Sequence, residues 1–271
     1  MTSLVSWIGA DQRGPASAYI ATDSRISWEG AGHWDHGRKV FASRARPELF
    51  AYVGDVLFPS LILGQLVTAI DEGLIFTDGD SPQQRADKIA DAIQLAFQSM
   101  PSATRNGFQV LYVTREDIEM NSTFHAFAVE WSPQKEWVRS SLSTPQVSDT
   151  VVIWGSGSES IRKWRQRWNQ SSQKNTSRAV FSAFCDSVLD GADPKSGGAV
   201  QLVGIYRIGP GRTFGIVSGG GPYVFGLNVG NGTPANTVKW HNRYFERCDP
   251  DGKKIEEGQA HHVPKGLGGK A

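Results

Sequence analysis

Apolar residues alternate with polar ones in four short runs near the start of the chain. These runs cover residues 3–10, 17–25, 38–44 and 48–54. The turn-rich segment DQRGPA separates the first two runs. Alternation over short runs with turn residues between them indicates strands, and closely spaced strands are typical of antiparallel hairpins. The first fifth of the sequence therefore predicts stacked β-hairpins.

After Gly54 the period changes to that of a helix. Residues 58–72 form an apolar segment of helical length that ends before Gly73. A second helix is predicted from Ser81, which serves as N-cap, with Pro82 in the first turn and Gln84 completing a capping box. Its apolar positions recur on one face up to Met100.

Strands and helices then alternate in groups for the rest of the patterned region. Further strands are predicted at residues 107–115, 123–131, 150–155, 198–208 and 213–218. Two helices lie between them: one has Ile161, Trp164 and Trp168 on one side, and the other runs from the N-cap Thr176 to Gly191.

Grouped strands alternating with pairs of helices argue against a parallel βαβ sheet. They predict an α+β fold in which two antiparallel sheets are stacked between two helical layers, a four-layer αββα sandwich. No repeat or linker divides residues 2–218, which we interpret as one domain. Residues 219–271 are rich in Gly and polar residues, so we expect a C-terminal extension whose last twenty or so residues are mobile.

Composition narrows the classes of protein further. The net charge is +1 over 271 residues. The protein therefore has no strong overall positive charge that would attract nucleic acid or an anionic membrane. No apolar run reaches the roughly 20 residues that span a bilayer, and no secretory signal is visible. Cys185 lies in a helical pattern and is interpreted as a small buried apolar residue, so no disulfide with Cys248 is expected. These features predict a soluble cytoplasmic protein.

Thr2 is the first candidate for chemistry, because a small residue at this position favours removal of Met1. Removal would give Thr2 a free α-amino group, whose ordinary pKa is about 8. A hydroxyl is a weak nucleophile until a base takes its proton, and this amine is a base on the same residue. Such a site also needs a nearby cation, an acid to orient it and backbone N–H groups for the oxyanion.

The sequence has residues of these types in matching motifs. Asp23 lies in ATDSR, Lys39 in GRKVF, and Gly54 in FAYVGD just before the first helix. Ser156 lies in WGSGS after a central strand, and Asp193 and Ser196 lie in DPKSGG before the next one. With Thr2, these motifs make the chain similar to the catalytic β subunits of proteasomes and their bacterial relatives, which are N-terminal-nucleophile (Ntn) hydrolases.

The resemblance covers about residues 2–218. The 16-residue interval from Asp23 to Lys39 is close to that of the family, while the turn before Asp23 is a few residues longer. Asp55 stands where the family usually has a second glycine. The expected loop 29–37, the insertion 131–148 and the chain after 218 exceed the compact family core.

The resemblance implies a role for each matching residue. Thr2 would be the nucleophile, Lys39 would lower the pKa of its amine, and Asp23 would hold Lys39. Gly54 N–H would bind the oxyanion. Ser156 would be the supporting serine of the family, and Asp193 and Ser196 would help to position the terminal amine. Tyr52 and Val56 would line the pocket for the substrate residue before the scissile bond, which favours a medium-sized apolar side chain.

The implied function is that of a threonine endopeptidase without a cofactor, acting on polypeptides inside a homo-oligomeric ring or helical stack. A separate AAA+ ATPase would unfold the substrates, because the chain has no Gly-x-x-x-x-Gly-Lys-Ser/Thr motif. Nine Trp residues are consistent with subunit interfaces. Two alternatives stay open: an Ntn amidase that cleaves a small amide, and a non-catalytic ring subunit.

Other interpretations of single motifs are weaker. VVIWGSGSES lacks the third glycine and the distant acid of a dinucleotide site. The basic residues of IRKWRQRWNQ fall opposite its apolar face, which indicates a solvated surface and not a nucleic-acid site. HWDH at 33–36 and HH at 261–262 do not form a set of metal ligands at a known spacing.

Overall fold

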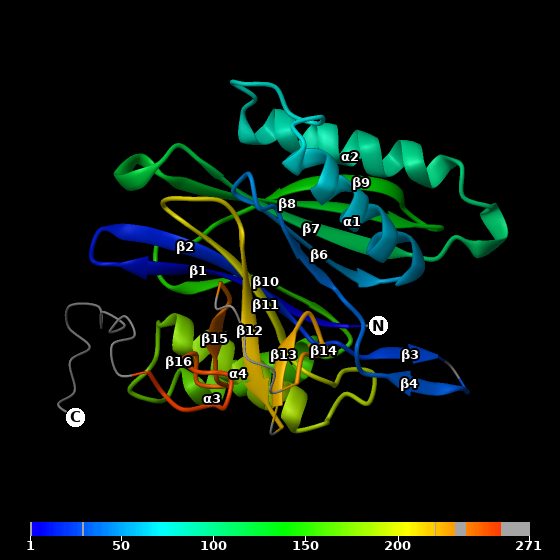
Figure 1. Ribbon diagram of the computed structural model, residues 1–271. Helices are drawn as coiled ribbons and strands as arrows, with labels where there is room; N and C mark the ends of the chain where they lie inside the picture. Colours follow the sequence, from blue (N-terminus) through cyan, green and yellow to red (C-terminus); the bar gives the residue numbers. More distant parts are fainter. Residues whose placement is uncertain (1, 29, 220, 231–236, 256–271) are drawn as a thin grey trace.

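The chain folds as a mixed α/β structure of antiparallel sheets and helices (Figure 1). The computed structural model describes residues 2–28, 30–219, 221–230 and 237–255. Its strands pair in an antiparallel manner except where β12 meets β15. The helices lie in pairs, α1 with α2 and α3 with α4.

The first sheet has the strand order β10-β1-β2-β11-β12-β13-β14, and β15 and β16 join it beside β12. Its strands are β1 (Ser3–Asp11), β2 (Gly14–Thr22), β10 (Asp149–Gly155), β11 (Gln201–Tyr206), β12 (Arg212–Ser218), β13 (Gly221–Val224), β14 (Leu227–Asn228), β15 (Lys239–His241) and β16 (Arg247–Cys248).

The second sheet has the order β5-β6-β7-β8-β9, and a separate hairpin is formed by β3 and β4. Their bounds are β3 (Ile26–Trp28), β4 (Gly32–Trp34), β5 (Val40–Ala42), β6 (Glu48–Gly54), β7 (Phe108–Glu116), β8 (Thr123–Ser132) and β9 (Glu136–Leu142).

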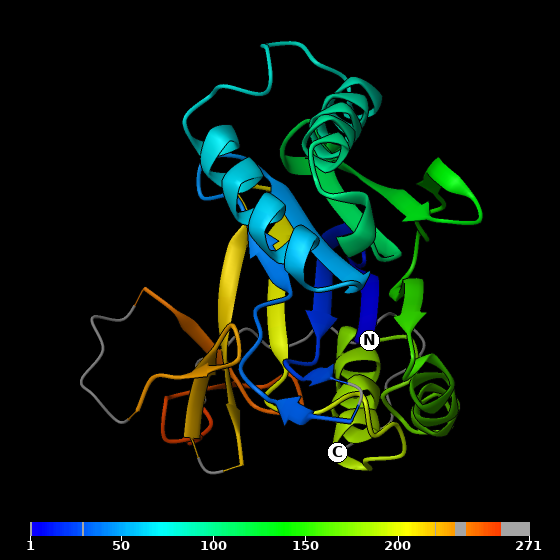
Figure 2. The ribbon, with the colours of Figure 1, turned by 90° about the vertical axis from the view of Figure 1, so that its right-hand side faces the viewer.

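The described residues contain four α-helices and two short 3₁₀ turns. They are α1 (Leu57–Asp71), α2 (Pro82–Gln98), α3 (Ser158–Trp168), α4 (Ser177–Leu189), and the turns Ser102–Thr104 and Glu119–Asn121. Figures 1 and 2 place α1 and α2 over the second sheet, and α3 and α4 against the first sheet. The predicted caps of α2 and α4 are confirmed: Ser81 and Gln84 form a capping box, and Thr176 accepts from Ala179 N–H.

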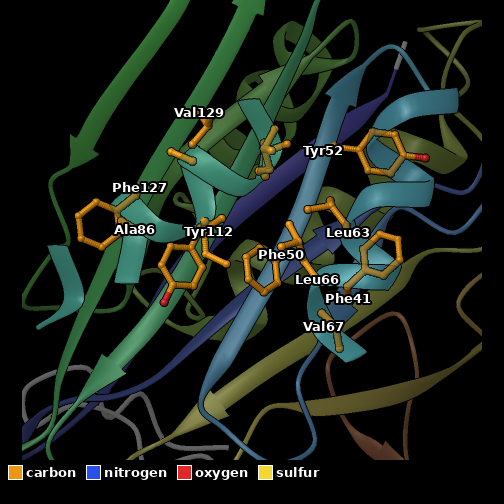
Figure 3. Close-up of a cluster of buried hydrophobic side chains, with 14 of the residues drawn as sticks. Phe41, Phe50, Tyr52, Leu63, Leu66, Val67, Ala86, Tyr112, Phe127 and Val129 are labelled. Atoms are coloured by element: carbon orange, nitrogen blue, oxygen red, sulfur yellow. The ribbon is translucent and has the colours of Figure 1, made fainter. Parts of the chain in front are cut away.

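Three apolar clusters hold these elements together. The first joins α1 and α2 to one face of the second sheet, and Figure 3 shows Phe50, Tyr52 and Tyr112 of that face. The second cluster contains residues of both sheets, and the third joins the first sheet to α3 and α4.

Strand β6 shows why the second sheet is apolar on both faces. Phe50 and Tyr52 belong to the cluster beneath the helices, whereas Leu49, Ala51 and Val53 belong to the cluster shared with the first sheet. Successive side chains of a strand point to opposite faces, so one strand supplies two clusters. Such burial fixes the register, because a shift of one residue would exchange the two sets.

The first hairpin differs from the sequence prediction in its boundaries. DQRGPA is mostly strand: β1 continues to Asp11 and β2 begins at Gly14, which has φ +101°. Arg13 N–H donates to Asp11 at 2.7 Å, and Arg207 makes a bidentate pair with the same carboxylate. The Asp11 side chain and Gly14 therefore close a turn of two residues.

The predicted strand at 38–44 is also shorter in the structure. Only Val40–Ala42 pair with β6. Lys39 directly precedes the strand, and its backbone N–H donates to the Gln201 side chain at 3.1 Å instead of to a neighbouring strand. Residues 29–37, expected as a loop, include strand β4, and residues 131–148 include β9.

Part of the C-terminal extension packs against the predicted domain. Trp240 covers Gly215, where an added Cβ would lie 2.2 Å from its ring. Phe245 contacts Trp7, Tyr19 and Phe181 in the third cluster. The domain boundary at 218 stays a prediction, and most of the segment expected to be mobile lies outside the described residues.

Candidate active site

A buried ion pair joins two of the predicted residues. Lys39 Nζ donates to Asp23 Oδ1 at 2.8 Å, and neither side chain has any exposed surface. Nζ also donates to the Arg25 carbonyl at 2.5 Å. Burial lowers the pKa of Lys39, and the Asp23 carboxylate opposes this effect. The sequence separates the two residues by one hairpin, and the fold brings them together.

The Asp23 carboxylate accepts from four donors. Oδ1 accepts from Lys39 Nζ and from Ser3 N–H at 3.0 Å. Oδ2 accepts from Arg25 N–H at 3.1 Å and Gly197 N–H at 3.0 Å. A buried carboxylate is costly unless its oxygens are hydrogen-bonded, and here both are fully used.

The other predicted residues form a second cluster around Asp193. Its Oδ2 accepts from Ser156 Oγ at 2.6 Å and Ser196 Oγ at 2.7 Å, and Oδ1 accepts from Lys195 N–H at 3.1 Å. Partial burial favours the neutral acid, but these hydrogen bonds outweigh it and lower the pKa of Asp193. The carboxylate thus fixes both serines.

Ser3 connects the two clusters. Its N–H donates to Asp23, and its Oγ is 2.8 Å from Ser196 Oγ. Thr2 immediately precedes it and is fully buried, and its Oγ1 has no hydrogen-bond partner among the described residues. Both clusters therefore converge at the head of β1, beside Thr2. Met1, whose removal the sequence predicts, lies outside the described residues.

Close contacts require glycine at two positions, Gly155 beside Thr2 and Gly54 at the end of β6. Gly155 has φ +90°, and a Cβ there would lie 1.6 Å from the Thr2 carbonyl oxygen. Gly54 ends β6 with φ +95°, and a Cβ would lie 2.5 Å from the Gly107 carbonyl oxygen. Gly54 pairs with Phe108 at the end of β6, which gives it a defined backbone direction just before α1.

The predicted pocket residues lie on either side of Gly54. Tyr52 is buried, and its hydroxyl donates to the Arg38 carbonyl at 3.1 Å. Val56 is half-buried and packs against the first apolar cluster. Asp55 caps the first turn of α1 by accepting from Phe58 N–H at 3.2 Å. An acidic side chain before a helix is favourable, which gives this residue a local structural role.

The β3–β4 hairpin begins directly after the Asp23 motif. Arg25 makes a bidentate pair with Asp35, at 2.7 and 2.9 Å, and this ties the two ends of the hairpin together. Trp28 and Trp34 lie on this hairpin and are 52% and 49% exposed. A charge-assisted clamp therefore closes the base of the hairpin, which carries two half-exposed tryptophans.

The turn between β13 and β14 reaches the segment that leads to Lys39. His36 Nδ1 donates to the Gly226 carbonyl at 2.8 Å, and the Arg38 guanidinium lies between the rings of Phe41 and Phe225. Gly226 has φ +80°, and a Cβ there would lie 2.7 Å from Ser24 Cβ. The C-terminal extension thus contacts Ser24, which follows Asp23, and His36, which lies shortly before Lys39.

Sequence reasoning missed three residues of this region: Ser3, Arg25 and Gln201. Gln201 is 1% exposed and bonds to the backbone of Asp23, Gly37 and Lys39. Its only signal in the sequence is an amide within the otherwise apolar run AVQLVGI. Ser3 and Arg25 are neighbours of predicted residues in the sequence, but their roles depend on contacts with residues of other segments, Ser196 for Ser3 and Asp35 and Lys39 for Arg25.

Two residues of the HWDH motif have hydrogen-bond partners within the protein. Asp35 and His36 of HWDH are engaged with Arg25 and Gly226, while the second histidine pair lies outside the described residues. In the described part of the chain no three metal-ligating side chains form a group, and no helix is long and apolar enough to cross a membrane. Cys185 is buried, as predicted, and both Cys185 and Cys248 are free.

Helix α3 buries one of its four basic residues, contrary to the prediction of a solvated basic face. Arg165 is buried on the inner side, with its guanidinium 2.9 Å from Asp149, so it does not belong to the solvated face. Arg162, Lys163 and Arg167 are exposed, as the helical spacing predicts.

Comparison with solved structures identifies the fold. Anbu (ancestral beta-subunit) from Yersinia bercovieri aligns with a TM-score of 0.50 and 11% identity, over 82% of this chain and 87% of that one. The chain has a proteasome β-subunit-like fold. Similarity at this level shows the fold alone.

Two further structures resemble this proteasome-like chain. The Anbu (Gly-1) mutant from Hyphomicrobium sp. strain MC1 has a TM-score of 0.49 and 11% identity, over 83% of this chain and 88% of that one. Eukaryotic HslV from Trypanosoma brucei has a TM-score of 0.45 and 10% identity, over 75% and 99%. No protein-family model and no curated protein matches the sequence.

The hydrogen bonds of Asp193 should make the free energy of unfolding depend on pH. Because its folded pKa is lowered from 3.8, the carboxylate stabilises the fold above that pH, and the contribution is lost as the pH falls through the folded pKa. We expect Asp193→Asn to lower the free energy of unfolding by about 1 kcal/mol at pH 7, the size of a charged hydrogen bond discounted for partial exposure. Urea denaturation at a series of pH values measures this difference.

The difference between Asp193→Asn and wild type should begin to narrow below about pH 4 and should close as the pH falls through the lowered pKa of Asp193. Asp78→Asn is the control, because that carboxylate is fully exposed and lies 3.7 Å from Arg46. It should change stability little at any pH. A constant difference for Asp193→Asn across the whole range would contradict the assigned ionisation.

Proposed function

We propose that the chain is a threonine peptidase of the Ntn-hydrolase class, built as a four-layer αββα sandwich, that hydrolyses peptide bonds with Thr2 after loss of Met1. The observation that carries this proposal is the convergence of two polar clusters on Ser3. Asp23 accepts from Ser3 N–H, and Ser196 Oγ lies 2.8 Å from Ser3 Oγ. The residue before Ser3 is Thr2, whose buried hydroxyl has no hydrogen-bond partner among the described residues.

In the proposed reaction, Thr2 Oγ1 attacks the carbonyl carbon of the scissile amide. The α-amine takes the hydroxyl proton and passes it to the leaving amine as the C–N bond breaks. This leaves an ester on Thr2, which water hydrolyses to release the acid. Because the α-amine must be neutral to act as base, a nearby cation that lowers its pKa favours the reaction.

Each cluster has a distinct part in this proposal. Lys39 supplies the cation, and Asp23 holds Lys39 through the 2.8 Å pair. Asp193 orients Ser156 and Ser196, which position the amine. Gly54 N–H stabilises the oxyanion, which is the larger electrostatic contribution in acyl transfer.

We further propose that Tyr52 and Val56 border the pocket for the substrate residue before the scissile bond and favour a medium-sized apolar side chain.

Two alternatives use the same fold: an Ntn amidase for a small amide, and a non-catalytic subunit. A mixed peptide library separates the three, because a peptidase cleaves many peptides and an amidase turns over only small amides. A non-catalytic subunit cleaves neither.

The first prediction from this proposal concerns covalent labelling. Peptide epoxyketones react with a hydroxyl and a free amine on the same residue, so the native protein should be labelled. Thr2→Ala and Lys39→Ala should each reduce the labelling rate by at least about 100-fold, the typical loss when a nucleophile or a preorganised charge is removed. Mass spectrometry of the intact protein measures the rate.

Thr2→Ser is the matched control for this experiment, since it keeps a hydroxyl and an amine on a small second residue. It should retain labelling. Undiminished labelling of Thr2→Ala, with all variants folded by circular dichroism, would rule out Thr2 as the nucleophile.

The second prediction concerns assembly. An unregulated peptidase would degrade cellular proteins, so we propose that the site is enclosed in a homo-oligomer fed by a separate AAA+ ATPase. Closed symmetric assemblies are the usual form of homo-oligomers. Mass photometry over a dilution series should show a species of several subunits. A monomer that still cleaves small amides would contradict enclosure and favour the amidase.

A further inference from the structure

The amide of Gln201 is buried at the centre of the candidate site. Gln201 is the first residue of β11 and is 1% exposed. Its Oε1 accepts from Lys39 N–H at 3.1 Å. Its Nε2 donates to the Asp23 carbonyl at 3.1 Å and to the Gly37 carbonyl at 2.7 Å. One side chain thus joins the end of β2 to the segment that enters β5.

The chemistry of these partners allows only one orientation of the amide. A backbone N–H only donates and a carbonyl only accepts, so Oε1 must face Lys39 and Nε2 must face the two carbonyls. A reversed amide would set its NH₂ group against Lys39 N–H and its oxygen against two carbonyl oxygens. The Gln201 side chain is therefore matched to this set of backbone groups.

Gln201 and Asp23 hold Lys39 at its two ends. Gln201 fixes the backbone N–H, and Asp23 and the Arg25 carbonyl fix Nζ. Lys39 lies before the paired residues of β5, so β6 does not hold its backbone through the ladder. The hydrogen bond to Gln201 takes the place of that ladder bond, and it fixes the position of the Lys39 backbone from which the side chain extends.

We propose that Gln201 is a positioning residue that sets the place of Lys39 Nζ relative to Thr2 and to Asp23. This proposal rests on the proposed function, because it assigns Gln201 a role in the rate of acyl transfer. A displacement of about 1 Å in a catalytic group commonly reduces the rate by about 100-fold. The loss should fall on kcat and leave KM little changed, because Gln201 is buried and does not meet substrate.

Gln201→Glu gives the sharpest test, because glutamate has the same shape and lacks the amide donor. As a carboxylate it sets an oxygen against two carbonyl oxygens, whereas the protonated acid donates one hydrogen bond. Burial raises the pKa of such a carboxyl above its usual value of about 4.3. We expect kcat to fall by about 10- to 100-fold at pH 8. The ratio of variant to wild-type kcat should rise as the pH is lowered.

The assay follows cleavage of a fluorogenic peptide over a range of pH, with each protein's active sites titrated by a peptide epoxyketone. Titration corrects for misfolded protein, so kcat is given per reactive Thr2. Gln201→Met is a second variant of similar length without charge. It should show the same loss of kcat with a ratio that does not change with pH, and it replaces Gln201→Glu if that variant does not fold.

Thr22→Val is the matched control. Thr22 is the register partner of Gln201 on β2, is fully buried, and has a hydroxyl without a hydrogen-bond partner among the described residues. The variant alters the same place in the sheet but removes no hydrogen bond to Lys39. Because the substitution lies outside the hydrogen-bond network, its kcat should stay within about 2-fold of the wild-type value.

Two outcomes would overturn the proposal in different ways. If wild type reacts with the epoxyketone and both Gln201 variants keep wild-type kcat per site, Gln201 does not position Lys39 and the peptidase proposal stands. If wild type neither reacts nor cleaves peptide, the peptidase proposal fails and the role of Gln201 in it fails too.

Discussion

The buried pair of Lys39 and Asp23 is the constraint on which the rest of the site depends. Two charges without exposed surface carry a desolvation cost of several kcal/mol, which is offset only by good geometry and additional hydrogen bonds. The structure provides them: Asp23 accepts from three backbone N–H groups as well as from Lys39. The head of β1, the end of β2 and the segment before β11 are held at fixed positions by this one carboxylate.

The same constraint explains why residues far apart in sequence meet beside Thr2. Ser3 and Gly197 are both donors to Asp23, and the loop that contains Gly197 also contains Asp193 and Ser196. Ser3 then contacts Ser196 directly. The pair therefore orders the second cluster as well as the first. Lys39 Nζ and the N–H of Ser3, the residue after Thr2, donate to the same carboxylate oxygen, and this shared acceptor is the link on which the proposed mechanism rests.

Much of the fold could be predicted from local pattern. The caps at Ser81 and Thr176 and the alternation along β6 are determined by neighbouring residues, so the sequence indicates them directly. The pairing of Asp23 with Lys39 followed from family motifs. Gln201 could not be predicted, because its partners are backbone groups of two other segments and leave no side-chain pattern. The strands after Ser218 were missed for a similar reason, since they are short and are stabilised by packing of Trp240 and Phe245 on the sheet.

The central claim is that the nucleophile is a residue with both a hydroxyl and a free α-amine. Peptide mapping of native protein after reaction with a peptide epoxyketone tests it most directly. The account predicts a single adduct on an N-terminal peptide that begins at Thr2, with Met1 absent. An unlabelled N-terminal peptide that retains Met1, or an adduct at any other residue, would contradict it.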